Sequence, residues 1–155
     1  MPPDKSPGAA GLIIGEDMAY CTGAQMVLKF GADDMAHVTD YDGDGAYDVA
    51  TVDAAIDSIS AYMDSYFAVL YAVPIVPTTD DIRDCCIQLT WCYLLTGRDS
   101  LTETHEKQCK QWNDWLKDCA TGKAIPSGAV PSASASAPYA RWESNDRIFG
   151  RDKFL

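Results

Sequence analysis

The sequence predicts a mainly α-helical protein with one small domain of about four helices, an extended N-terminal arm and a linker-tethered C-terminal arm. Hydrophobic residues make up 47% of the 155 residues, which is enough for a buried core. Apolar residues recur at spacings of three and four, in windows bounded by capping residues, glycine or proline. We expect a flexible arm over residues 1–19, the helical domain over 20–122, a linker over 123–138 and a docking arm over 139–155.

The first expected helices lie on either side of an aspartate-rich loop. Thr22 is suited to cap a short helix that ends at Gly31, and the following ADDMAHV can add a further helical turn. After the loop, residues 51–73 have the clearest helical period, and Pro74 marks their end.

Two more helices are expected after a proline-containing connector. Residues 80–97 are apolar around most of the helix circumference, which predicts a central helix packed on several sides. Residues 100–123 have one apolar stripe, with Thr102 as the expected cap and Gly122 as the expected end.

The charge of the chain limits its partners. A formal net charge of -11 argues against a grip on nucleic acid, which needs Lys and Arg to displace counterions. An acidic chain suits basic partners, cations, or a passage through which DNA slides without sticking. No apolar segment approaches the length of a membrane span, and the N-terminus lacks a signal-peptide core, so we expect neither membrane insertion nor export.

The cysteines are expected to be reduced core residues. Their even number suggests disulfides, but two are adjacent and most lie among apolar residues within helical patterns. No pair has the C-x-x-C spacing and the chain has two histidines, so we expect no zinc site. The six are Cys21, Cys85, Cys86, Cys92, Cys109 and Cys119.

The stretch TDYDGDGAYD has the carboxylate spacing of a calcium-binding loop, with Gly45 at the sharp turn. The last ligand position of such a loop needs a bidentate carboxylate, but here it is Thr51. The sequence therefore favours a metal-free acidic turn, with a weak calcium site as the alternative. The candidate ligands are Asp40, Asp42, Asp44 and Asp48.

No set of catalytic residues stands out, so we expect no enzyme. His37 lies beside the acidic loop and His105 lies early in a helix, and each is typical of a structural or surface histidine. An enzyme would require one of them to line a pocket with an acid or a thiol.

The C-terminal segment 139–155 is aromatic and basic, and it follows a stretch rich in Pro, Ser and Ala. We interpret it as an arm that docks on its own domain, on another subunit or on a partner. Aromatic and arginine side chains are typical anchors of interfaces. The expected contact residues are Arg141, Trp142, Arg147, Ile148, Phe149, Arg151 and Phe154.

The order of the motifs resembles the Mu-like phage head–tail connector family. The chain has a short helix ending in KFG, then HVTDYDGDGAYD, a long helix with AIDSISAYMDSYF, the break YAVPI, the helix DIRDCCIQLTWCYL and a terminal RIFGRDKFL. The resemblance spans Tyr20–Gly122 and resumes at Arg147–Leu155. The longer N-terminal arm, the many cysteines and the serine–alanine linker depart from the family pattern.

The resemblance implies a virion protein at the neck of the particle, present in the host cytoplasm before assembly. Such adaptors form a ring, commonly dodecameric, on the portal protein and bridge it to the head-closure or tail-terminator protein, with DNA passing through the lumen. It implies no catalysis, no required cofactor, no sequence-specific nucleic acid binding and no membrane. A position as the head-closure subunit stays open, and a small calcium-binding module is the alternative function.

Overall fold

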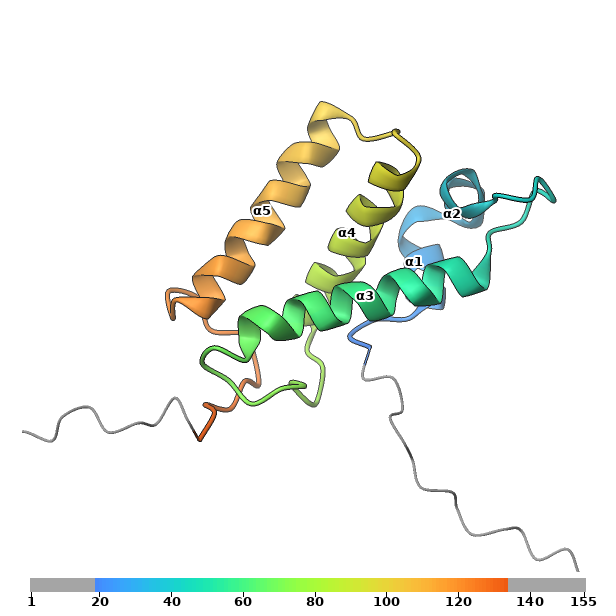
Figure 1. Ribbon diagram of the computed structural model, residues 1–155. Coiled ribbons are helices and arrows are strands. Elements are labelled where there is room, and N and C mark those ends of the chain that lie inside the picture. The colour runs from blue at the N-terminus through green and yellow to red at the C-terminus, as the bar shows by residue number, and fades with distance from the viewer. Residues whose placement is uncertain (1–18, 134–155) are drawn as a thin grey trace, which may run out of the picture.

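The computed structural model describes residues 19–133, which form five α-helices and no β-strand (Figure 1). This confirms the mainly helical class. The predicted N-terminal arm, apart from Ala19, and the predicted C-terminal arm lie outside the described residues. The helices are α1 (Gly23–Phe30), α2 (Ala32–Thr39), α3 (Val49–Phe67), α4 (Asp80–Gly97) and α5 (Glu103–Ala120).

Helices α3, α4 and α5 pack on one another and form the body of the molecule, with α3 crossing the antiparallel α4–α5 pair (Figure 1). Helix α1 packs against α3 and α4 near the start of α3, and α2 packs against α1 and α4. The fifth helix is α2, where the sequence predicts only a further turn. It begins directly after Gly31, whose φ of 92° lets the chain change direction between the two short helices.

The core is filled from all five helices. Met26, Met35, Met63, Ile82 and Leu116 are each fully buried and represent one helix apiece. The apolar face of every helix therefore points toward one interior. Burial of this apolar surface is the main favourable contribution to the free energy of folding.

Aromatic contacts join helices across this core. Trp91 of α4 stacks on Phe30 of α1 with ring centroids 4.2 Å apart. Trp115 of α5 meets Phe67 of α3 edge-on at 6.2 Å. None of the helices within residues 19–133 has the length and apolarity to cross a bilayer.

Helix α3 ends at Phe67, six residues before the predicted end. The apolar period continues to Val73, but the backbone turns away, because the Ala72 N–H donates to the Val130 carbonyl at 2.8 Å. Tyr71 also pairs with Pro131 in an isolated antiparallel bridge. A pairing partner sixty residues away, invisible to the local period, therefore sets the end of this helix.

The segment 123–133 lies against the helices, although the sequence assigns it to a linker. Pro126 is fully buried, and the Ser127 N–H donates to the Asp81 carboxylate at 2.9 Å. The Ser132 N–H donates to the Leu70 carbonyl at 2.9 Å. The contacts of the helical domain thus continue past Gly122 to Ser132.

One expectation about the cysteines is wrong. Cys92 of α4 and Cys109 of α5 form a disulfide, with Cα atoms 6.0 Å apart. Both lie within apolar helical patterns, and only the antiparallel packing of α4 on α5 brings them opposite each other. The other four, Cys21, Cys85, Cys86 and Cys119, are free and buried, as predicted for core residues.

Candidate functional site

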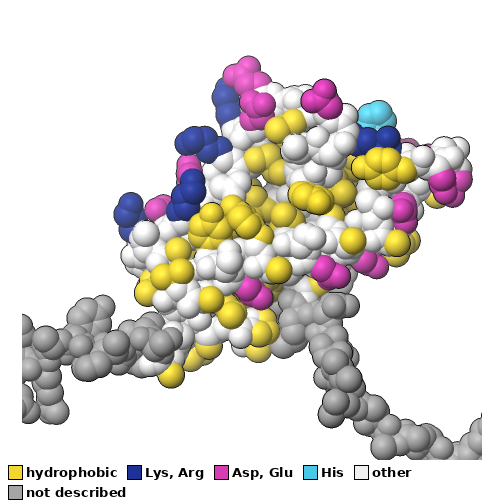
Figure 2. All heavy atoms as spheres, in the orientation of Figure 1, with side chains coloured by type: hydrophobic (Ala, Val, Ile, Leu, Met, Phe, Trp, Pro, Cys, Tyr) yellow, Lys and Arg dark blue, Asp and Glu magenta, His cyan; other side chains and the backbone are white. Residues whose placement is uncertain are grey.

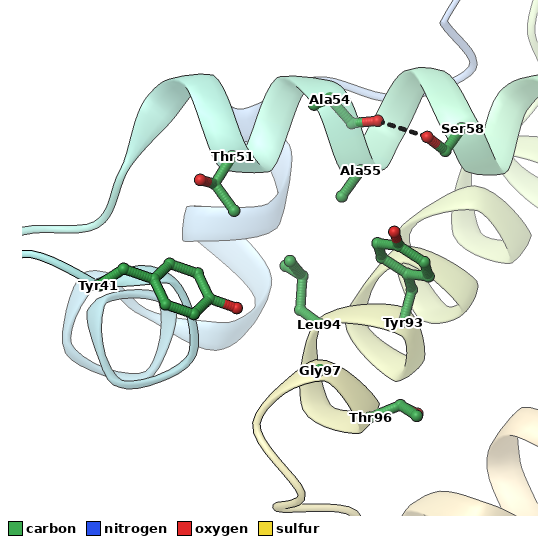
Figure 3. A pocket seen from close by; sticks show the side chains of 9 residues that line it. All are labelled: Tyr41, Thr51, Ala54, Ala55, Ser58, Tyr93, Leu94, Thr96 and Gly97. Carbon is green, nitrogen blue, oxygen red and sulfur yellow. Dashed lines mark hydrogen bonds between the residues drawn. The ribbon is translucent and has the colours of Figure 1, made fainter.

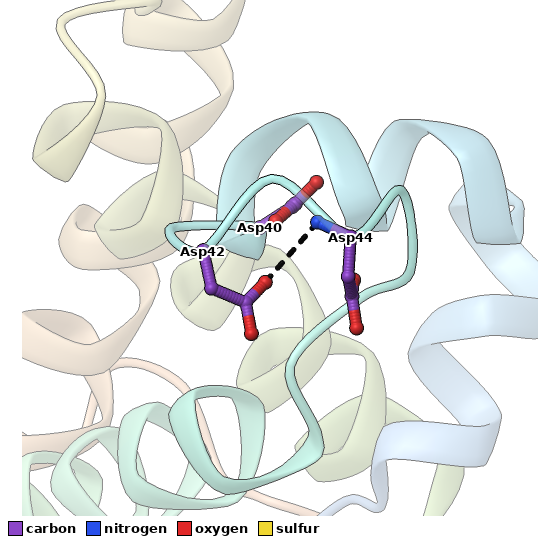
Figure 4. Close-up of side chains that lie close together, drawn as sticks. All are labelled: Asp40, Asp42 and Asp44. Carbon is purple, nitrogen blue, oxygen red and sulfur yellow. Dashed lines mark hydrogen bonds between the residues drawn. The ribbon is translucent and has the colours of Figure 1, made fainter.

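The aspartate loop between α2 and α3 is a series of turns held by its own carboxylates (Figure 4). Asp40 accepts hydrogen bonds from the backbone N–H groups of Gly43 at 2.6 Å and Gly45 at 2.9 Å. Asp44 accepts one from the Ala46 N–H at 2.8 Å. Both glycines have φ near 80°, which side chains disfavour, so the Asp–Gly pattern has a direct structural cause.

The structure brings together three of the four predicted calcium ligands. Carboxylate oxygens of Asp40, Asp42 and Asp44 all lie within 4.8 Å of one another. Asp48 lies apart from this group and caps α3, accepting hydrogen bonds from the Ala50 N–H at 3.0 Å and from the Thr51 hydroxyl at 2.5 Å.

The electrostatics of the loop follow from these bonds. Backbone hydrogen bonds from Gly45 and Gly43 lower the pKa of Asp40 below 3.8. The hydrogen bond from the Thr51 hydroxyl likewise lowers the pKa of Asp48. Both carboxylates are therefore ionised at neutral pH, and the loop presents negative charge to solvent.

Arg98, just after α4, anchors the loop to the body. Its Nε donates to the Val38 carbonyl at 3.2 Å, its Nη2 donates to the Asp40 carbonyl, and its guanidinium lies 3.9 Å from the centroid of the Tyr41 ring. Nothing in the sequence pattern around Arg98 indicates this contact, which joins residues about sixty positions apart.

His37 and His105 line one hollow of about 500 Å³ together with Asp34. An enzyme would require a histidine that lines a pocket together with an acid or a thiol, and this hollow contains two histidines and an acid. The side chain of His105 is engaged locally, however, because its Nδ1 lies 3.0 Å from the Thr102 hydroxyl at the cap of α5. This arrangement is that of a helix-cap histidine.

A groove runs between α3 and α4 and continues to α5; we call it the α3–α4 groove. Its first part has a volume of about 520 Å³ and is walled by Ala54 and Ser58 of α3 and by Tyr93 and Thr96 of α4 (Figure 3). Tyr41 closes the end beside the aspartate loop (Figure 3). The lining is mostly apolar.

The second part of the groove extends the first, since both share Ser58, Tyr93 and Thr96. It has a volume of about 470 Å³, and the Cys92–Cys109 disulfide forms part of its wall. At its far end the Tyr62 hydroxyl donates to Asn113 of α5 at 2.9 Å. Figure 2 shows apolar side chains over this face, between α3 and the α4–α5 pair.

Sequence reasoning misses this groove. Its α3 wall consists of small residues at helical spacing, and such a pattern equally fits a helix packed closely on another helix. The predicted contact residues of the C-terminal arm, from Arg141 to Phe154, lie outside the described residues.

Comparison with known proteins identifies the family. The family model described as Bacteriophage Mu, Gp36 matches residues 20–140, which include all five helices, the aspartate loop and both walls of the groove. Gene product J of Escherichia phage Mu is 27% identical over 114 residues, which cover 70% of this chain and 77% of that protein. The chain therefore belongs to the Bacteriophage Mu Gp36 family and is a Mu-like phage protein.

Proposed function

We propose that this chain is a structural protein of the phage particle, a head–tail connector subunit. It forms a ring, dodecameric by resemblance to Mu-like connectors, between the portal protein and the head-closure or tail-terminator protein. The observation that carries the proposal is the family match over residues 20–140, with a relative in phage Mu matched over most of its length. The protein works at the neck of the virion, after synthesis in the host cytoplasm.

The charge of the chain supports this role. With 23 Asp and Glu residues against 12 Lys and Arg residues, the protein repels a DNA backbone. A ring of such subunits can surround DNA without retaining it, so the proposal includes no sequence-specific nucleic acid binding. It includes no membrane contact either.

The architecture also supports an adaptor. A helical body can hold two neighbours at fixed separation, and the predicted C-terminal arm offers aromatic anchors and arginines for acidic surfaces. The proposal assigns contacts with a neighbouring subunit or with the portal protein to the predicted arm residues. It assigns the chain no catalytic activity and no required cofactor.

A phage that lacks this chain tests the role. We expect induced cells to contain DNA-filled heads and complete tails that are not joined, as counted by electron microscopy. Expression of the wild-type chain from a plasmid restores joined particles. Joined, infectious particles without the chain would contradict the connector role.

A second candidate is a calcium-binding module, favoured by the closeness of the Asp40, Asp42 and Asp44 carboxylates. Calorimetric titration of the full chain with CaCl₂, with MgCl₂ as control, tests it. The double variant Asp42→Asn/Asp44→Asn is the matched control, because asparagine can keep the turn hydrogen bonds but lacks the charge. Calcium-specific heat that the variant loses supports the module; absence of heat in the wild type rejects it.

A further inference from the structure

We propose that the α3–α4 groove binds the C-terminal segment Tyr139–Leu155 of a second copy of this chain. The inference rests on the proposed function in one respect, because it supplies the subunit contact that a ring needs. The connector role itself names no such contact surface on the helical body.

The groove has the character of a protein docking site. Its two joined parts have volumes of about 520 and 470 Å³, within the range of clefts that bury large side chains. Tyr93 stands in the shared middle with 55% of its surface exposed, and Tyr41 at one end is 61% exposed. Exposed tyrosines around small residues offer apolar area with hydroxyl groups at the edge, as at protein interfaces.

The C-terminal segment has matching chemistry. It carries large apolar side chains, including Trp142, Phe149 and Phe154, which suit hollows walled by Ala54 and Ser58. It also carries four Lys and Arg residues against three Asp and Glu residues, whereas the whole chain has a net charge of -11. Figure 2 shows acidic side chains beside the apolar band on the α3 side, where basic residues of a bound segment can pair with them.

The length of the chain beyond residue 133 is sufficient for the segment to reach a groove. The Ser132 N–H donates to the Leu70 carbonyl, just after the end of α3. Residues 134–138 then extend the chain by up to about 17 Å before the first aromatic residue. Tyr62, at the end of the groove opposite Tyr41, lies eight positions before Leu70, which corresponds to about 12 Å at the rise of an α-helix.

Whether the C-terminal segment enters its own groove or that of another copy distinguishes a monomer from a ring. A groove filled by its own segment satisfies both surfaces and leaves no contact for a neighbour. A segment that enters the next copy leaves that copy's segment free for the following one, so the contact repeats from head to tail and closes as a ring. The second arrangement therefore supplies a subunit contact for the proposed connector ring.

A complementary pair of variants tests the inference. The first ends at Pro138, so it has the groove without the segment and keeps all described contacts of residues 19–133. The second is the full chain with Ala54→Trp, which fills the groove from an exposed position on α3. Each alone should be monomeric by light scattering, and an equimolar mixture should double in mass to a one-to-one complex.

Controls keep the test decisive. If Ala54→Trp fails to fold by circular dichroism, Thr96→Arg replaces it, because Thr96 is exposed and lines both parts of the groove, where the larger side chain would obstruct the segment. Adding Trp142→Ala and Phe149→Ala to the groove-filled chain should abolish the complex. A mixture of two folded variants that stays monomeric would overturn the inference, including the case in which the segment occupies its own groove.

The result is separable from the connector role. If the complex forms but phage lacking the chain still joins heads to tails, the connector role fails and the groove assignment stands. If the chain is required for joining but the variant mixture stays monomeric, the groove assignment fails and the connector role stands.

Discussion

At the scale of single residues, the acidic loop depends on groups outside its own sequence. Its aspartates hold the turns, but Arg98 connects those turns to the body through the carbonyls of Val38 and Asp40 and the ring of Tyr41. The position of Tyr41 matters beyond the loop, because this ring closes one end of the groove.

Arg98→Ala should release the loop. We expect a loss of about 1–3 kcal/mol in the free energy of unfolding, since hydrogen bonds from a charged donor to carbonyls are removed. Hydrogen exchange at the Gly43 and Gly45 amides should become faster while the exchange of α5 amides is unchanged. Lys110→Ala removes a cation from the exposed face of α5 and serves as control. Equal exchange in both variants would contradict the anchoring role.

The loop was predictable from its residues, but its support was not. The Asp–Gly spacing correctly favours turns, because glycine tolerates positive φ and aspartate bonds to nearby backbone N–H groups. Of the four predicted ligands, Asp48 caps the following helix. Arg98 is distant in sequence, and no local period reveals a contact of that kind.

At the scale of elements, local periodicity predicts the range of a helix well where no contact from a distant segment sets its end. The range predicted for α4 agrees with the structure, and the caps Thr22 and Thr102 are confirmed. The predicted end of α3 is wrong, and residues past Gly122 contact the helices, because residues 71–72 pair with residues 130–131. The prediction of reduced cysteines also fails because of a long-range contact, since the Cys92–Cys109 disulfide depends on how α5 packs on α4.

Removing the disulfide should destabilise the α4–α5 pair. The two cysteines are 17 positions apart, and a loop of that length gives about 3 kcal/mol in the chain-entropy account. Urea unfolding should show this loss for Cys92→Ser/Cys109→Ser. A reductant should bring the wild type toward the variant and leave the variant unchanged. A wild type insensitive to reductant, with the variant equally stable, would contradict a stabilising bond.

Asp81 holds the segment 123–133 against α4, and this contact should depend on pH. Burial alone would raise the pKa of Asp81, but hydrogen bonds from Thr79 and Ser127 outweigh it and lower the pKa below 3.8. A carboxyl whose pKa is lower in the folded state contributes stability above its unfolded pKa. That contribution is lost as the pH falls through the folded pKa.

Asp81→Asn should therefore cost about 1 kcal/mol of unfolding free energy near neutral pH. The difference from wild type should shrink as the pH falls below about 3.8, the ordinary pKa of the group. Urea unfolding across this pH range measures it, with Asp53→Asn on exposed α3 surface as the control of equal charge. A difference that is constant with pH would show that the carboxylate is not the group responsible.

At the scale of the whole molecule, all five described helices contribute buried residues to one core. We expect a chain truncated after Pro138 to keep its circular dichroism and its midpoint of thermal unfolding within a few degrees, because every core contact named above lies in residues 19–133. The same truncation should abolish assembly into particles. Normal particles made with the truncated chain would show that the arm is dispensable.

The sequence predicts the protein family but not the groove on the helical body. The motif order leads to the Mu-like family, which the comparison confirms at the level of a Mu-like phage protein. The predicted docking arm appears in the sequence as a change in composition. The α3–α4 groove does not appear there, since it exists only where α3 crosses α4 and exposes small residues beside Tyr93.

The connector role is tested most directly by locating and counting this chain in intact particles. Mass spectrometry would compare its amount with that of the major capsid protein, and electron microscopy with a specific label would find its position. The account predicts roughly a dozen copies per particle, all at the single vertex where the tail joins. Complete absence from mature particles, or a distribution over the whole capsid, would contradict it.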